Sequence, residues 1–124
     1  MVRLKRNECS VLKLVLKRKW YDMIASGEKK EEYRESKKHW WTRIGGWMAN
    51  SIPNGDVFDI ISGECKNMVV GFSLGYRKAD LFFIADAVLD SGAKYPERTR
   101  HPEWGEPDLP HYVIKLGERV ELVE

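Results

Sequence analysis

The stretch SVLKLVLKRKWYDMIASGEKKEEYRE, residues 10–35, carries the clearest structural pattern in the chain. Residues 10–17 alternate between two faces, one of them carrying Leu12, Leu14 and Leu16, which indicates a half-buried strand. Apolar side chains recur at helical spacing over residues 19–26, and Gly27 stands where a helix often ends on glycine. Residues 30–35 then have the composition of a second strand. The stretch therefore predicts a strand–helix–strand unit.

Beyond this unit the sequence predicts one more short helix over residues 37–44, which Gly45 and Gly46 would close. Proline and glycine mark a loop at residues 50–55 and an irregular segment at residues 91–110. The remaining predicted strands are residues 57–61, 67–76, 81–89 and 112–123, the last as a strand pair or one long strand bent at Gly117. Five or six strands with two or three short helices predict an α+β fold, a small, closed or nearly closed mixed β-barrel.

Composition favours one globular domain over residues 1–124. Apolar residues make up 43% of the chain and charged residues 32%, which is not the composition of a disordered protein. No apolar run approaches the ~20 residues of a membrane span, and no signal peptide is expected. Cys9 and Cys65 form no metal-like spacing, so we expect two reduced thiols and a cytoplasmic protein, with one disulfide as the alternative.

The charge is distributed unevenly along the chain. Residues 1–44 carry 13 Lys and Arg against 6 Asp and Glu, a balance of +7, and residues 45–124 carry 8 against 13, a balance of −5. A basic first third favours a phosphate-bearing or otherwise anionic partner. Solvated lysines that only confer solubility are the alternative.

The densest group of charged side chains follows Gly27. In a strand, Lys30, Glu32 and Arg34 would share one face, and Glu31, Tyr33 and Glu35 would share the other. Lys29 lies at the bend after the helix, where its side chain could enter a cleft. Such an arrangement could hold an anion, orient a water molecule, or form a salt bridge between Glu32 and Arg34 that only fixes the strand.

These residues resemble the ASCH domain family, which belongs to the PUA-like β-barrel superfamily. The resemblance covers most of residues 10–119. Its motifs here are Leu12-Lys13-Leu14, the tryptophan-containing helix, Ser26-Gly27-Glu28-Lys29, Glu32-Tyr33-Arg34, Phe72 with Gly75-Tyr76, the strand through Val88, and residues 112–117.

The resemblance implies a cleft between the first helix and the sheet that binds RNA or a nucleotide-like ligand. Some members of the family look like ribonucleases, and others are amidohydrolases acting on N4-acetylcytidine. The lysine of the cleft maps onto Lys29. The Lys-Thr-x-Thr pattern of the amidohydrolases reads Lys29-Lys30-Glu31-Glu32 here, so both threonines are absent.

Each candidate site residue has an assigned role. Lys29 is a phosphate contact, an oxyanion stabiliser or a base, and Glu32 is a general base or orients a ribose. The ligand-binding candidates are Lys17, Lys29, Tyr33, Arg34, Tyr76 and Arg77, with Tyr76 as the stacking residue and Tyr33 or Tyr76 as an acid.

The remaining aromatic and histidine residues are less informative. Trp40, Trp41 and Trp47 are either core or a stacking platform, and we expect Trp41 and Trp47 in the core. Trp104-Gly105 is either a lid over the cleft or a plain surface loop. The histidines, His39, His101 and His111, are far apart in sequence, so we expect no metal site and no cofactor.

Three hypotheses result. The first is an RNA- or nucleotide-binding ASCH domain with a basic cleft. The second is an ASCH-type hydrolase, either a metal-independent ribonuclease or an amidohydrolase on a modified nucleoside. The third is a barrel without catalytic activity that binds an acidic protein partner.

Overall fold

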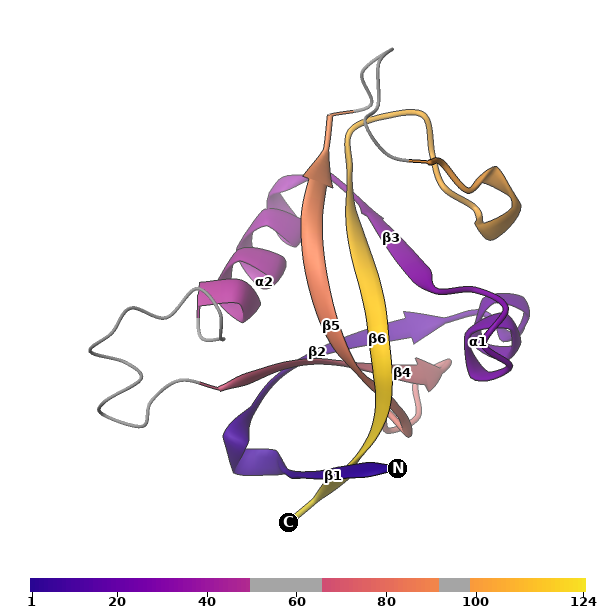
Figure 1. The fold of residues 1–124 in the computed structure, drawn as a ribbon. Coiled ribbons are helices and arrows are strands. Elements are labelled where there is room, and N and C mark those ends of the chain that lie inside the picture. Colours follow the sequence, from indigo (N-terminus) through magenta and orange to yellow (C-terminus); the bar gives the residue numbers. More distant parts are fainter. Residues whose placement is uncertain (50–65, 92–98) are drawn as a thin grey trace.

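The computed structural model describes residues 1–49, 66–91 and 99–124. Six strands form one mixed sheet, and two α-helices pack beside it (Figure 1). The elements in chain order are β1 (Val2–Lys5), η1 (Arg6–Glu8), β2 (Cys9–Leu16), α1 (Arg18–Ala25), β3 (Glu31–Glu35), α2 (Lys38–Ala49), β4 (Asn67–Leu74), β5 (Leu81–Asp90), η2 (Pro102–Trp104) and β6 (His111–Val123).

The predicted strand–helix–strand unit is present as β2, α1 and β3, and the final segment is the single long strand β6. The predicted strand at residues 57–61 and loop at residues 50–55 lie outside the described residues. β1 was not predicted. Its four residues pair in parallel with the end of β6, and the alternation of Val2-Arg3-Leu4-Lys5 covers too few residues to predict a strand.

β6 organises the sheet. It pairs along one side with β5, and its other side is shared by β3 near its start and β1 near its end. The sheet order is β1-β6-β5-β4-β2, with β3 on β6, and Figure 1 shows β2 and β4 crossing β5 and β6 steeply. The described strands do not close into a barrel, so the closed PUA-like barrel stays a prediction.

The outer edge of β2 explains why the described sheet stays open there. In the described part of the chain, the carbonyls on this edge accept hydrogen bonds from side chains and not from another strand. Arg34 Nη2 donates to the Val15 carbonyl at 3.2 Å, and Arg43 Nη2 donates to the Lys13 carbonyl at 2.8 Å. The Trp40 ring lies between the two guanidinium groups, at 5.2 Å from that of Arg34 and 5.0 Å from that of Arg43.

α2 differs from its prediction, because it continues through Gly45 and Gly46 to Ala49. Glycine inside a helix costs about 1 kcal/mol relative to alanine, and packing outweighs that cost here. Ile44 and Trp47 are buried on the sheet side, and Trp47 Nε1 donates to the carbonyls of Ser10 at 2.9 Å and Val69 at 3.0 Å.

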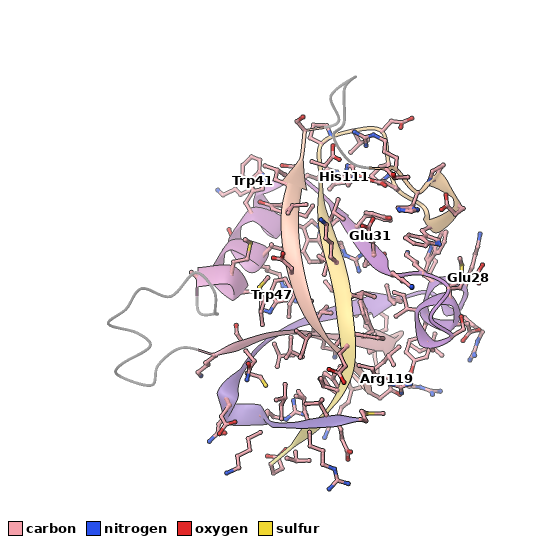
Figure 2. All side chains as sticks on the ribbon, viewed as in Figure 1. Glu28, Glu31, Trp41, Trp47, His111 and Arg119 are labelled. Carbon is pink, nitrogen blue, oxygen red and sulfur yellow. The ribbon has the colours of Figure 1, made fainter. Side chains whose placement is uncertain are left out.

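The tryptophans of α2 divide between core and surface (Figure 2). Trp47 is buried, as predicted. Trp41 is 52% exposed and its indole N–H donates to the Ser36 hydroxyl, so the prediction of a core position for Trp41 is wrong. Trp41 lies six residues before Trp47, and that spacing turns the two side chains to different sides of a helix.

The main core fills the space between the helices and the sheet. Its buried members come from β2, β4 and β5, together with Ile24 of α1, Ile44 and Trp47 of α2 and Ile114 of β6. Cys9 belongs to a smaller cluster with Val69, Phe82 and Val120, and burial raises the pKa of its thiol. Cys9 is not in a disulfide, and Cys65 lies outside the described residues. No helix in the described part of the chain is long and apolar enough to cross a membrane.

A substitution at Gly71 of β4 tests the packing of Phe82 against the sheet. A Cβ atom at Gly71 would lie 2.6 Å from a ring carbon of Phe82, so we expect Gly71→Ala to lower the free energy of unfolding by about 1–3 kcal/mol. The control is Gly45→Ala in α2, where a Cβ would meet no heavy atom within 4 Å. Because alanine favours a helix more than glycine does, this substitution should raise the free energy of unfolding by roughly 0.5–1 kcal/mol. Urea denaturation measures both, and equal effects would contradict the packing of Phe82 on Gly71.

Candidate functional site

The turn after α1 places Lys29. Gly27 has φ = +86°, a left-handed conformation that costs glycine little, and its N–H donates to the Ile24 carbonyl at 3.1 Å. Two residues later the Lys29 N–H donates to the Met23 carbonyl at 3.0 Å. The chain therefore folds back under α1, and the Lys29 side chain enters the protein instead of the solvent.

Lys29 is buried, with 2% of its surface exposed. Its Nζ donates to Glu32 Oε1 at 2.8 Å and lies 4.2 Å from the centre of the Trp20 ring and 5.6 Å from that of Tyr33. Burial lowers the pKa of Lys29, and the nearby Arg34 and Lys19 act in the same direction, while Glu32 opposes the shift. The ammonium group is thus held by one carboxylate and two aromatic faces.

Glu32 joins Lys29 to Arg34. Its second oxygen, Oε2, accepts from Arg34 Nη1 at 2.7 Å, and the same Nη1 lies 2.8 Å from the Tyr33 carbonyl. Glu32 and Arg34 share a face of β3, as predicted, and the salt bridge between them, one of the alternatives considered from the sequence, is present. Lys29 and not the exposed Lys30 completes the Lys29–Glu32–Arg34 network.

The segment after residue 99 covers this network from outside. A Cβ on Gly105 would lie 3.0 Å from a carbon of the Trp20 ring, so the Gly105 backbone rests directly on Trp20. Trp20 in turn covers the Lys29 ammonium. The Trp104 ring stacks on His101 at 3.9 Å between ring centres. Trp104-Gly105 therefore belongs to a segment that packs on Trp20, and Trp20 separates this segment from Lys29.

A second buried polar cluster surrounds His111, which Figure 2 labels at the start of β6. His111 Nε2 is 2.8 Å from Glu106 Oε2, and its Nδ1 faces the Leu109 carbonyl. Arg100 Nη2 donates to Asp90 Oδ1 at 2.9 Å, and its Nη1 is 3.8 Å from Glu106 Oε2. Asp90, Glu106 and His111 are donors of the type that holds a divalent cation. Here the Arg100 guanidinium supplies the positive charge beside both carboxylates.

Sequence spacing missed this cluster, because its members lie on separate segments. His111 was predicted to lack metal-ligand partners, and the fold brings Glu106 and Asp90 to it. Tyr33 lies next to this cluster, because its ring meets that of His111 edge-on at 5.7 Å between centres. The Tyr33 hydroxyl donates to Glu31 Oε1 at 2.9 Å.

The other predicted ligand residues meet on the surface. A groove of about 680 Å³ lies between the end of β2 and the end of β4. We call it the Tyr76 groove, and it is lined by Val15, Leu16, Lys17, Arg18, Leu74, Gly75, Tyr76 and Arg77. The parallel pairing of β2 with β4 sets Leu16 opposite Leu74, so the residues that follow both strands emerge at the same end of the sheet.

Apart from the buried Tyr33, the predicted site residues form two groups. Lys17, Tyr76 and Arg77 line the Tyr76 groove, whereas Lys29, Glu32 and Arg34 form the buried network. Arg34 connects the groups, because it donates to the carbonyl of Val15, which also lines the groove. Arg18 of the groove and Trp20 over Lys29 were not singled out as site residues. Both belong to α1, whereas the helix predicted from sequence begins one residue later, at residue 19, and their positions depend on the rotation of α1 against the sheet.

Neither a protein-family model, nor a curated protein, nor a solved structure matches this chain.

Because Lys29 is buried, we expect the stability of the protein to depend on pH. Because the pKa of Lys29 is lower in the folded state than the ordinary 10.5, the unfolded chain binds more protons between the two values. The contribution of Lys29 to the free energy of unfolding should therefore rise as pH rises through that window and fall as pH falls. Urea titrations across this range compare the protein with Lys29→Met, in which the rise should be absent.

Lys30→Met is the matched control, because Lys30 is the exposed neighbour of Lys29 in the chain. Its pH dependence should follow that of the unmodified protein. A Lys29→Met curve that stays parallel to the unmodified protein at every pH would show that the folded state does not disfavour the Lys29 ammonium.

Proposed function

We propose that this protein binds RNA or a nucleotide-like ligand in the Tyr76 groove. The observation that carries the proposal is the complete exposure of the Tyr76 side chain, at 101% of its reference surface, beside three cations, Lys17, Arg18 and Arg77. A large aromatic ring in full contact with water gains by stacking on a base. The cations around it neutralise phosphate.

The composition of the groove suits such a ligand. Val15, Leu16 and Leu74 supply apolar surface, while the cations stand at the ends of β2 and β4 and in α1. A volume of about 680 Å³ lies within the roughly 300–1,000 Å³ of small-ligand sites. Among the described residues that line this groove none is acidic, and its three cations attract an anion.

The buried network has a supporting role in this proposal. Arg34 already contacts Glu32, the Tyr33 carbonyl and the Val15 carbonyl, so it fixes the β2 wall of the groove. The same network contains the residues that resemble the ASCH domain, Lys29 and Glu32-Tyr33-Arg34. We propose membership of that family, with a PUA-like arrangement of strands, on this local resemblance and on the strand–helix–strand unit that carries it.

The binding experiment compares variants of the groove by fluorescence anisotropy with a labelled single-stranded RNA. Tyr76→Ala should weaken binding by about 1–3 kcal/mol if one base stacks on the ring. Lys17→Ala and Arg77→Ala should each lower the slope of log affinity against log salt by about 0.7.

Lys115→Ala is the control for loss of charge, because Lys115 is an exposed lysine of β6, which contributes no residue to the groove. It should bind like the unmodified protein. If no RNA or nucleotide binds, or if Tyr76→Ala and Lys115→Ala behave alike, the groove is not the binding site.

A hydrolase is the second candidate. The buried Lys29, whose pKa is lowered by burial and which contacts Glu32, has the character of an acid–base pair. In such a mechanism Glu32 would accept a proton from water or a ribose hydroxyl, and Lys29 would stabilise the developing oxyanion. The pair lies beneath Trp20, so this mechanism requires that the Trp20–Gly105 contact open.

We expect binding without turnover. Labelled RNA incubated with the protein and a chelator should stay intact, and N4-acetylcytidine should not be deacetylated. Formation of product from either substrate would instead indicate a hydrolase. The Glu32→Gln variant should then form no product, while Tyr76→Ala should keep the rate per bound substrate.

A further inference from the structure

A second hollow lies beside the same strand. It has a volume of about 410 Å³, and its lining includes Arg6, Lys13, Lys78 and Phe82. We call it the Lys13 hollow. Like the Tyr76 groove, it is bordered by three cations. Its one carboxylate belongs to Glu124, which pairs with Arg6 at 3.5 Å and is itself largely exposed.

The two depressions share both of their walls. On one wall, Val11 and Lys13 line the Lys13 hollow, while Val15 and Lys17 line the Tyr76 groove. These positions alternate along β2 and its continuation, so their side chains project from the same face of the strand. On the other wall, Lys78 of the hollow follows Arg77 of the groove in the turn between β4 and β5.

The spacing of the cations along β2 matches the phosphate spacing of an extended nucleic-acid strand. Residues two apart on a strand lie about 6.8 Å from one another, so Lys13 and Lys17 stand roughly 14 Å apart. An extended nucleic-acid strand repeats its phosphates at an interval close to the two-residue step. Lys13 and Lys17 therefore stand about two phosphate steps apart along one strand, and Lys78 and Arg77 on the other wall can each contact a further phosphate of that strand.

We propose that the Lys13 hollow and the Tyr76 groove form one track for a single-stranded nucleic acid several nucleotides long. This inference rests on the proposed function and specifies its ligand. Tyr76 stacks on an unpaired base, and the backbone continues along β2 into the Lys13 hollow. A duplex keeps its bases stacked on one another and presents none to Tyr76, so it fits the track poorly.

Oligouridylates that increase from a dinucleotide to an octanucleotide test the track by fluorescence anisotropy at several salt concentrations. Affinity should rise with length until the strand reaches the Lys13 hollow. The double variant Lys13→Ala/Lys78→Ala should lower the salt slope of the octanucleotide by about 1.4, because each phosphate contact of a single strand contributes about 0.7. The same variant should leave dinucleotide binding unchanged.

Both lysines are exposed, so the double variant should fold normally, and circular dichroism verifies this. If the dinucleotide and octanucleotide bind equally well, or if the double variant keeps the full slope, the track is wrong while the Tyr76 groove remains a site. If no oligonucleotide binds, the proposed function itself fails. A fully paired RNA duplex or polyglutamate that competes as well as the octanucleotide would overturn the single-strand assignment.

Discussion

The ammonium group of Lys29 constrains much of this fold, because a charge removed from water must be compensated within the protein. Moving an ion into the interior costs several kcal/mol, and a single carboxylate nearby repays that only with good geometry. Glu32 supplies the carboxylate, and Trp20 and Tyr33 present their rings to the cation. These contacts tie α1 to β3, and the Gly105 backbone closes over Trp20. Without this arrangement Lys29 would leave the interior and the turn after α1 would lose its anchor.

The charges of the first third of the chain therefore serve two different purposes. Lys29 and Arg34 both pair with Glu32 inside the protein, where burial shields them from a ligand. Lys13, Lys17 and Arg18 point into solvent, where each is available to an anion. The balance of +7 over residues 1–44 therefore overstates what a partner would meet at any one site. Local placement, more than the total charge, supports the proposed ligand.

Local patterns predicted local structure well. The alternation before Lys17, the glycine at the end of α1 and the shared face of Glu32 and Arg34 all depend on neighbours in sequence. Three features could not be predicted this way. The groove depends on the register that sets Leu16 beside Leu74, the Asp90–Glu106–His111 group depends on the path of a long connection, and α2 continues through Gly45 because Trp47 finds two carbonyl partners. Each requires contacts between segments that are distant along the chain.

The side chains along the outer edge of β2 have a further consequence for how molecules of this protein meet one another. An unpaired strand edge offers a ready template to which a second chain can add. Here Arg34 and Arg43 occupy the carbonyls of Val15 and Lys13, with Trp40 packed between them. A neighbouring strand would have to displace two hydrogen-bonded cations before it could pair. These two arginines therefore protect the edge of β2 against pairing with another molecule. Substitution of either arginine would free one backbone carbonyl and favour aggregation through this edge.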